Sequence, residues 1–323
     1  MNVDSYRIHE AAVRLGYIDA RPVTGHPFDI WINRLKNIPL GQHFSFEHDP
    51  ATLSGWPLNE ITIWVAIAST PPVTEWPEGY GEIGAYYLGY EDQVKRRNAW
   101  ETAVTEMGYE IIPDVTLPER AAAIRAGFGV HGLNGLLITP EYGSYVNITV
   151  LLVHEAPPST ARGPEYDMSA GCGSCGDCVH VCPTGAISIE DGVDTTKCLR
   201  SYMNWTEYMP EEYYPRMGRR IVGCETCQQV CPKNDFIEKI TPPEDILECV
   251  LIEDLLTDTG AEKATDTIKC MLGSINKIKQ QAIFAAAYSK RKDLVSLIEQ
   301  ITKNDDEVLA KVAIWAVKHL KDI

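Results

Sequence analysis

The sequence lacks two features that would place it in a membrane or along a nucleic acid. No apolar run reaches the roughly 20 residues that a membrane-spanning helix needs, which excludes a helical membrane span. Basic residues are also few, with 29 Lys and Arg against 45 Asp and Glu and a formal net charge of −16. An acidic surface repels phosphate backbones, so extended non-specific nucleic-acid binding is disfavoured.

The first residues also lack the features of a secretory signal. They carry no basic start, no apolar stretch and no small-residue cleavage site. We therefore expect a cytoplasmic protein. Thiols stay reduced there, so the cysteines, eight of which lie between Cys172 and Cys231, are expected to be metal ligands rather than disulfides. Cys249 and Cys270 lie in predicted helices and are expected to be buried thiols.

Composition and hydrophobic periodicity divide the chain into three predicted domains. Residues 1–165 are predicted to form an α/β cofactor-binding domain, residues 166–244 a cysteine-rich module, and residues 245–323 a helical domain. Near-continuous apolar runs predict two buried strands, Glu60–Ser69 and Asn147–His154. The predicted helices of the first domain are Tyr6–Leu15, Asp92–Gly108 and Leu117–Ala126.

The helical domain contains a repeated alanine-rich segment. The residues around Ala282–Ala285 match those around Ala313–Ala316, with Phe284 in register with Trp315. This match predicts two helical-repeat units of the HEAT type. Two unrelated amphipathic helices are the alternative.

The first cysteine motif is C-x2-C-x2-C-x3-C-P, formed by Cys172, Cys175, Cys178 and Cys182. This is the bacterial ferredoxin spacing, in which three thiolates surround one [4Fe-4S] cluster and the fourth binds the other cluster. A pair of zinc sites is the alternative, but zinc sites do not need two Cys-Pro motifs with crossing ligands.

The second cysteine motif is one thiol short. Cys224, Cys227 and Cys231 keep the ferredoxin spacing, but Ile221 stands where a further cysteine is needed, and Cys198 is the available replacement. Counting ligands then predicts two [4Fe-4S] clusters. Cluster 1 takes Cys172, Cys175, Cys178 and Cys231, and cluster 2 takes Cys182, Cys198, Cys224 and Cys227.

Two adjacent clusters predict an electron path, fed by a soluble donor such as reduced ferredoxin or flavodoxin. A free ferredoxin needs far fewer residues than this chain has. The preceding α/β domain is therefore expected to hold the group that receives the electrons. The prediction is an electron-transfer protein or a reductase.

A glycine-rich turn precedes the cysteine module and contains Gly127, Gly129, Gly132 and Gly135. It follows a predicted helix rather than a strand, which is the wrong context for a dinucleotide-binding fingerprint. Glycine lets the backbone approach a ligand closely or adopt a positive φ. A loop that lines a flat cofactor and an ordinary tight turn both fit this pattern.

Taken in order, these segments resemble the epoxyqueuosine reductase family and the related reductive dehalogenases. The resemblance rests on AGFGVHGLNGLLITPEYGS at residues 126–144, on CGSCGDCVHVCPTGAI and on GCETCQQVCPKND, after an N-terminal α/β domain. It extends to DPATLSGWPLNEITIWVAIASTPP at residues 49–72 and covers nearly the whole chain.

The resemblance implies a nitroreductase-like α/β domain that binds base-off cobalamin, a ferredoxin-like double-cluster module and HEAT-like repeats. The clusters would reduce the cofactor to cob(I)alamin, which removes the epoxide oxygen of the queuosine precursor in tRNA, with an aspartate as proton donor. Glu119 and Arg120 match the family pattern, which places that aspartate at Pro113. Asp114, the catalytic candidate, is one residue out of register, so a divergent member is expected.

The glycine-rich turn supplies further candidate residues. His131 and Tyr142 are candidate catalytic residues, because histidine titrates near neutral pH and tyrosine can donate a proton. A hydrogen-bonded turn residue and a packing residue are the respective alternatives. For Asn134 and Ser144, backbone capping is the alternative to cofactor contact. The candidate cobalamin contacts are Gly127, Gly129, His131, Gly132, Asn134 and Ser144.

The resemblance implies tRNA as a partner, although the acidic charge argues against it. Reduction of a small molecule such as an organohalide, reduction of another corrinoid protein, and non-catalytic electron transfer are the alternatives. We expect a monomer without membrane partners. The candidate RNA contacts, for which a solvated helical face is the alternative, are Arg216, Arg219, Arg220, Lys277, Lys279, Lys290, Arg291 and Lys292.

Overall fold

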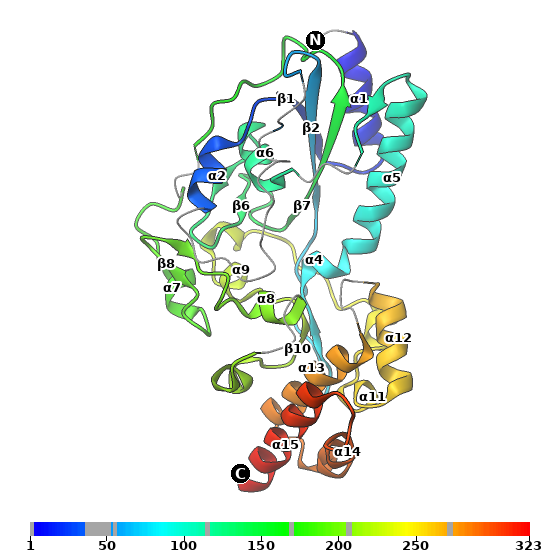
Figure 1. The fold of residues 1–323 in the computed structure, drawn as a ribbon, viewed down its shortest axis with the longest axis vertical. Helices are drawn as coiled ribbons and strands as arrows, with labels where there is room; N and C mark the ends of the chain where they lie inside the picture. The colour runs from blue at the N-terminus through cyan, green and yellow to red at the C-terminus, as the bar shows by residue number, and fades with distance from the viewer. Residues whose placement is uncertain are drawn as a thin grey trace.

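The structure is a computed structural model that describes residues 3–35, 53, 57–113, 117–167, 171–204, 209–269 and 274–323. A β-sheet covered by helices forms one end of an elongated molecule, and the C-terminal helices form the other end (Figure 1). The cysteine-rich segment lies between them. Among the helices that the structure describes, none combines the length and apolar character that a bilayer crossing requires.

The central sheet has four antiparallel strands in the order β1-β2-β7-β4. Its two long strands are β2 (Ile61–Ser69) and β7 (Val146–His154), which pair along their whole lengths. They confirm the two predicted strands. The edges are β1 (Asp19–Thr24) and β4 (Glu110–Ile111). Because all neighbouring strands are antiparallel, this region is an α+β rather than a parallel α/β arrangement.

Both faces of the sheet are covered by helices, which explains why β2 is apolar almost throughout. Residues Ile61, Ile63 and Val65 point to one core, and Trp64 and Ala66 point to the other, as the period of two in a strand requires. Helix α6 (Glu119–Arg125) covers the first face. Helices α1 (Val3–Arg14) and α5 (Tyr90–Glu106) pack together over the second face (Figure 1). These three helices confirm the predicted ones.

Shorter elements connect the sheet with the rest of the chain. The glycine-rich turn forms a small antiparallel hairpin of β5 (Val130–His131) and β6 (Leu137–Ile138), called here the glycine hairpin. The remaining elements before the cysteine motifs are α2 (Asp29–Leu35), β3 (Glu82–Ile83) and α4 (Ala85–Leu88).

The cysteine-rich module consists of short turns and single-turn helices. Thiolate ligands and loop geometry, rather than a large core, determine a fold of this kind. Its elements are α7 (Asp177–Val181), β8 (Ile187–Ser188), β9 (Gly192–Val193), α8 (Leu199–Asn204), η1 (Glu211–Arg216), β10 (Arg220–Val222), α9 (Thr226–Gln229) and η2 (Pro232–Asn234).

The C-terminal region is helical, as predicted. Phe284 and Trp315, the matched aromatic residues of the repeat, lie with ring centroids 6.1 Å apart and both pack on Tyr214. Assignment of these helices as HEAT repeats stays a prediction. The helices are α10 (Glu244–Leu247), α11 (Ile252–Leu255), α12 (Asp258–Ile268), α13 (Ile275–Tyr288), η3 (Lys292–Leu294), α14 (Val295–Ile301) and α15 (Glu307–Asp322).

One hydrophobic core crosses both predicted domain boundaries. It joins Ile83 and Tyr87 to Ile221 and Val222 of the module and to the C-terminal helices. In addition, β10 pairs in parallel with β3. The module is therefore held between the other two regions by apolar packing as well as by backbone hydrogen bonds.

A buried arginine fixes α6 to the chain that follows β1. Arg125 is 1% exposed, and its guanidinium donates to the carbonyl oxygens of His26 and Pro27 at 2.7 Å each while it stacks 3.8 Å from the ring of Phe28. Burial lowers the pKa of Arg125 to about 10, so the side chain stays charged at neutral pH.

We expect Arg125→Ala to lower the free energy of unfolding by about 2–4 kcal/mol, because it leaves two carbonyl groups unpaired and opens a cavity. Urea denaturation measures the change. Arg14→Ala, at an exposed position of α1, is the matched control and should change stability by less than about 0.5 kcal/mol. Equal effects of the two substitutions would contradict this role.

Candidate metal centre and adjoining cleft

Thiols from both cysteine motifs meet around one small cavity. Cys172, Cys175 and Cys178 line it together with Cys231, which is more than 50 positions away along the chain. Helices α7 and α9 pack against each other there. The cavity thus contains the four thiols predicted for cluster 1, including the one contributed by the other motif. Residues of the glycine hairpin, Leu133, Asn134 and Ile138, complete the lining with Asp177 and Pro232.

The other four thiols form a second group. Burial raises the pKa of the Cys227 thiol, and Cys224, Cys198, Cys178 and Cys182 raise it further. Burial also raises the pKa of Cys198, with Cys224 adding to the effect. Cys198 therefore lies within electrostatic range of the second motif, where the ligand count requires it.

These eight cysteines are free of disulfides. Among the described residues, no three His, Cys, Asp or Glu side chains are close enough to share a single metal ion. The thiolates of a cubane each bind a different iron atom, so they surround a cluster without converging on one point.

Backbone N–H groups point at several of the sulfur atoms. Leu133 donates to Cys172 Sγ at 3.4 Å, and Ala186 donates to Cys182 Sγ at 3.2 Å. The backbone amides of Arg200 and Ser201 lower the pKa of Cys198, partly opposing the effect of burial. Hydrogen bonds of this kind stabilise thiolate charge and tune the potential of a bound cluster.

A buried amide joins the glycine hairpin region to the second cysteine motif. Asn234 Oδ1 accepts from the backbone N–H of Ser144 at 2.8 Å, and its Nδ2 donates to the Gln228 carbonyl at 2.7 Å. Gln228 Nε2 in turn donates to the Ser144 carbonyl at 3.1 Å. Asn134 Nδ2 donates to the Cys227 carbonyl at 3.4 Å. Asn134 and Ser144, predicted to contact a cofactor, thus bind the cluster module, and cofactor contact stays a prediction.

The glycines of the turn mostly meet protein neighbours. A methyl group on Gly129 would overlap the carbonyl oxygen of Ile138 across the hairpin, and one on Gly143 would overlap Asn234 Oδ1. A methyl group on Gly132 would collide with Asn134 Oδ1, and one on Gly127, where φ is +73°, with the guanidinium of Arg162. The tight-turn alternative therefore accounts for these positions, and contact with a cofactor at Gly127, Gly129 and Gly132 stays a prediction.

The three catalytic candidates are not brought together by the described part of the structure. Asp114 lies outside the described residues. His131 is 5% exposed within the glycine hairpin, where its carbonyl accepts from the Gly171 N–H. Tyr142 is half-buried in the turn after β6, and its N–H donates to Thr139 Oγ1.

A glutamate links the second cysteine motif to α4. Glu225 Oε1 accepts from the Ala85 N–H at 2.6 Å, and burial raises the pKa of this carboxyl to about 7. Tyr145 is 3% exposed, and burial, followed by the charges of Glu225 and Cys227, raises the pKa of its hydroxyl. These contacts place the motif directly against the α+β region.

Ionisable residues at the start of α6 lie within electrostatic range of Cys198. Glu119 and Arg120, at the start of α6, have exposed side chains, yet burial by surrounding protein raises the pKa of Glu119 and lowers that of Arg120. Burial, with a further contribution from Glu119, raises the pKa of Tyr86 to about 12, and the charge of Arg200 opposes this rise.

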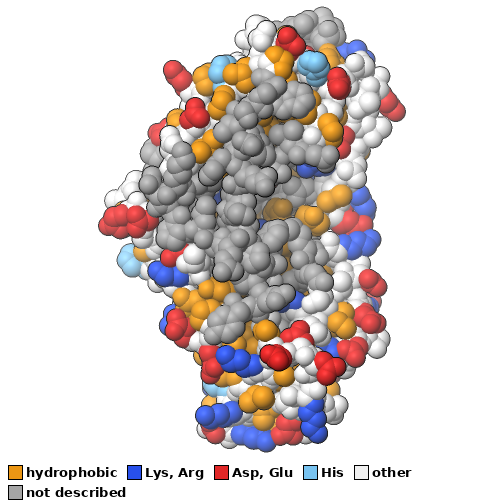
Figure 2. Space-filling view, viewed as in Figure 1, with side chains coloured by type: hydrophobic (Ala, Val, Ile, Leu, Met, Phe, Trp, Pro, Cys, Tyr) orange, Lys and Arg blue, Asp and Glu red, His pale blue; other side chains and the backbone are white. Residues whose placement is uncertain are grey.

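Most of the candidate RNA contacts bind other parts of the protein. Arg291 pairs with Glu253 and Asp293, and Lys279, which is 5% exposed, pairs with Asp258. Figure 2 shows acidic and basic side chains intermixed at the C-terminal end of the molecule rather than a continuous basic patch. Arg216, Arg219 and Arg220 donate to backbone carbonyl groups.

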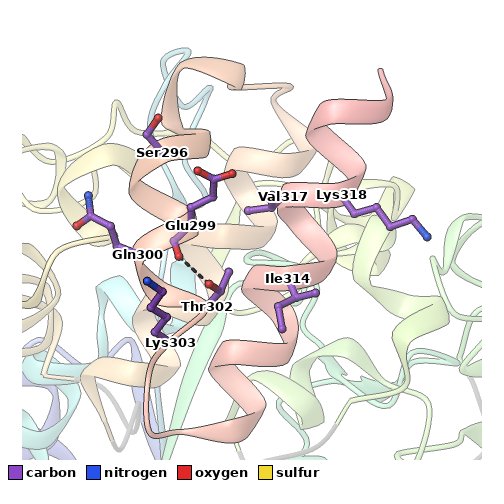
Figure 3. Close-up of a pocket in the computed structure, with 8 residues that line it drawn as sticks. All are labelled: Ser296, Glu299, Gln300, Thr302, Lys303, Ile314, Val317 and Lys318. Atoms are coloured by element: carbon purple, nitrogen blue, oxygen red, sulfur yellow. Dashed lines mark hydrogen bonds between the residues drawn. The ribbon is translucent and has the colours of Figure 1, made fainter.

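A separate surface groove of about 650 Å³ lies between α14 and α15, far from the cysteines along the molecule (Figures 1 and 3). Lys303, Lys318 and Ile314 line it, and none of its residues contributes to the cysteine cavity.

Comparison with known proteins agrees with this geometry. Residues 171–234 match the family described as a 4Fe-4S double cluster binding domain. An epoxyqueuosine reductase of Bacillus anthracis is 32% identical over 248 residues, which are 72% of this chain and 62% of that protein. One of Lactococcus garvieae is 29% identical over 272 residues, which are 78% of this chain and 74% of that protein.

The chain is a relative of the epoxyqueuosine reductases. Its fold is that of the solved epoxyqueuosine reductases from Bacillus subtilis and Streptococcus thermophilus, each with a TM-score of 0.79, at 23% and 21% identity. The two superpositions cover 98% and 100% of this chain and 90% and 91% of those chains. The matched region spans 62% of the length of the Bacillus anthracis relative.

Sequence reasoning missed several residues that lie near the cysteines in the structure of this relative of the epoxyqueuosine reductases. Asn234 and Gln228 had no motif of their own, although both flank the second cysteine motif. Arg200 lies two positions after Cys198, and this closeness in the sequence was the signal that could have identified it. Glu225 lies inside the C-x2-C pair, where no pattern distinguishes a buried carboxyl from an exposed one.

We expect Asn234→Ala to loosen cluster 1, because the turn after Cys231 loses its attachment to Ser144 and Gln228. Iron should be lost to a chelator roughly tenfold faster than from the wild-type protein, the scale found for residues that support metal ligands. Absorbance of the clusters measures the loss. Asn304→Ala, in the C-terminal region, is the control; an Asn234→Ala protein that loses iron at the control rate would refute the role.

Proposed function

We propose that this protein is an iron–sulfur reductase of the epoxyqueuosine reductase type, in which two [4Fe-4S] clusters deliver electrons to cobalamin for reductive removal of an oxygen atom. The observation that carries the proposal is the placement of Cys231 with the thiols of the first motif and of Cys198 with those of the second. Sharing of thiol ligands between the two motifs in this way is the ligand pattern of a double-cluster ferredoxin.

The cluster ligands follow from that placement. Cluster 1 is held by Cys172, Cys175, Cys178 and Cys231. Cluster 2 is held by Cys182, Cys198, Cys224 and Cys227. All eight thiols are accessible or half-buried rather than sealed in apolar packing, in contrast to Cys249, which is 2% exposed.

The two clusters face different surroundings, which gives the electron path a direction. Next to cluster 1, His180 and Val181 on α7 are exposed, so a soluble donor such as ferredoxin or flavodoxin has access there. Cys198, a proposed ligand of cluster 2, lies within electrostatic range of Arg120 in the α+β region. Electrons would therefore enter at cluster 1 and pass from cluster 2 to the α+β region.

The α+β region also carries buried polar groups that have no hydrogen-bond partner among the described residues and would suit the amide groups of cobalamin. Asn147 is 2% exposed and neither atom of its amide has a partner, and Gln93 Oε1 is also unpaired. A side chain on Gly89 would contact Thr70 at 3.0 Å and Asn147 at 3.3 Å, so the three lie together beside α4. A corrin ring carries amide side chains that satisfy such groups. When bound, cobalamin supplies a cobalt centre nucleophilic enough to attack a strained C–O bond.

For the substrate, we propose tRNA that carries epoxyqueuosine. A solved epoxyqueuosine reductase, matched here with a TM-score of 0.79, is bound to an epoxyqueuosine-modified tRNA stem loop. The net charge of −16 and the intramolecular pairing of most basic candidates favour a small-molecule substrate as the second candidate. Turnover of modified stem loop RNA, compared with turnover of small epoxides or organohalides, distinguishes the two.

We expect Cys198→Ser to remove about half of the iron, because only cluster 2 loses a ligand. Iron analysis and EPR of the reduced protein measure the loss. Cys249→Ala is the matched control. Cys249 lies in the core that includes the C-terminal helices, so this substitution should leave both clusters intact. Unchanged iron content and an unchanged EPR spectrum in Cys198→Ser would refute the ligand assignment.

We expect the protein to bind a corrinoid anaerobically and to show its sharp absorbance bands above the broad cluster absorption. Asn147→Ala should weaken this binding by about tenfold. A hydrogen bond between uncharged groups contributes about 1 kcal/mol, and a buried group that loses its partner costs more. Asn98→Ala, at an exposed position of α5, is the control. A wild-type protein that binds no corrinoid would overturn the cobalamin assignment and leave the cluster assignment standing.

A further inference from the structure

A pocket of about 220 Å³ lies at the β1 edge of the central sheet. Three apolar residues from different parts of the fold line it: Ala20 on β1, Trp64 on β2 and Ala126 after α6. Each of the three is at most 2% exposed. None of the residues that line this pocket also lines the cysteine cavity. Figure 1 shows α1 and β1 at the end of the molecule opposite to the C-terminal helices. The pocket is therefore separate from the metal centre.

Arg162 brings a positive charge to this pocket and is held in place at both ends. Its N–H donates to the Pro22 carbonyl at 3.1 Å, and its carbonyl accepts from the Thr24 N–H at 2.9 Å, which fixes the backbone beside β1. The guanidinium lies directly against the backbone of Gly127, where a methyl group would overlap its Cζ, Nη1 and Nη2 atoms. The charged group is thus positioned before any ligand binds.

The guanidinium of Arg162 forms no hydrogen bond or ion pair within the described part of the chain, although the sequence has 45 acidic and only 29 basic residues. The other charges of the pocket compensate one another. Asp19 Oδ2 accepts from Arg21 Nε at 2.8 Å. Asp19 Oδ1 accepts from His9 Nε2 at 3.0 Å and from the Ala20 N–H at 2.8 Å. With a neutral His9, one uncompensated positive charge therefore remains, on Arg162.

The pocket admits only a small ligand. Its volume is that of about seven water molecules. Sites for drug-sized molecules have volumes of about 300–1,000 Å³, so the ligand must be smaller than cobalamin or a tRNA stem loop. A positioned guanidinium favours the paired oxygens of an anion, which accept its N–H groups in charge-assisted hydrogen bonds. The apolar walls favour a hydrocarbon body next to that anion.

We propose that this pocket binds a small organic acid that has one carboxylate group and an apolar body. The carboxylate pairs with Arg162, and the hydroxyl of Thr160, which lines the same pocket, supplies a further donor. A carboxylate matches the single remaining positive charge, whereas a phosphate dianion would exceed it and would be repelled by Asp19. The inference does not rest on the proposed function, because it involves neither the clusters nor cobalamin.

A competing explanation is that Arg162 only covers Gly127, with its charge hydrated by solvent. The two explanations differ in what a small acid does. A covering residue contributes to the stability of the turn and binds no ligand, whereas a binding site is saturated by a carboxylate and loses affinity when the guanidinium is removed.

The test is calorimetric titration of hexanoate into the cluster-loaded, full-length protein, with hexanamide as the uncharged counterpart. We expect saturable binding of hexanoate and at least about tenfold weaker binding of hexanamide, because hydrogen bonds to charged groups are stronger than those to neutral groups. Affinity should rise about threefold for each methylene group from acetate to hexanoate, as apolar surface leaves water. Inorganic phosphate, which has no apolar body, should bind more weakly than hexanoate.

Arg162→Gln should weaken hexanoate binding by about tenfold or more. Arg162→Lys keeps the charge but loses the planar pair of donors, so it should weaken binding less. Arg14→Gln, at an exposed position of α1 outside the pocket, is the matched control and should bind as the wild type does. Urea denaturation of each variant confirms that a loss of binding is not a loss of folding.

Four results would contradict the proposal. A wild-type protein that binds no hexanoate would overturn the site in favour of the covering role. Equal affinities of Arg162→Gln and Arg14→Gln for hexanoate would overturn the assignment to this pocket. Hexanamide bound as tightly as hexanoate, or phosphate bound more tightly, would overturn the carboxylate class. Equal affinities for acetate and hexanoate would overturn the apolar body of the ligand.

Discussion

The meeting of Cys231 with the thiols of the first motif is the constraint on which the rest of the structure depends. It brings two segments more than 50 positions apart to one cavity, and the turns between them must close around it. Metal ligation and contact with neighbouring regions determine the fold of the module. The second half of the module is held against a shared core, where β10 pairs with β3.

The glycine hairpin acts as a support for this centre. Its residues reach the thiol cavity through Leu133 and Asn134, and the chain after it binds the second motif through Ser144 and Asn234. The α+β region thus fixes the loops that carry the thiols. Glu225 adds a further link, by accepting from the Ala85 N–H at the start of α4.

Much of this was predictable from sequence, because strands and helices with continuous or periodic apolar residues leave a clear pattern. The long strands of the sheet and helices α1, α5 and α6 were found in this way, and the cysteine spacing alone paired Cys231 with the first motif and drew in Cys198. The antiparallel sheet was not predictable, since a strand buried on both faces has the same apolar sequence in either direction. The roles of Asn134 and Ser144 depended on Asn234, a tertiary contact that no local pattern reveals.

Hydrogen exchange tests most directly whether the thiol centre and the glycine hairpin form one structural unit. Iron is removed from the loaded protein with a chelator under anaerobic conditions, and amide exchange is compared before and after. The account predicts faster exchange in residues 129–145 as well as in residues 171–235, with β2 and β7 still protected. An increase confined to residues 171–235 would contradict it.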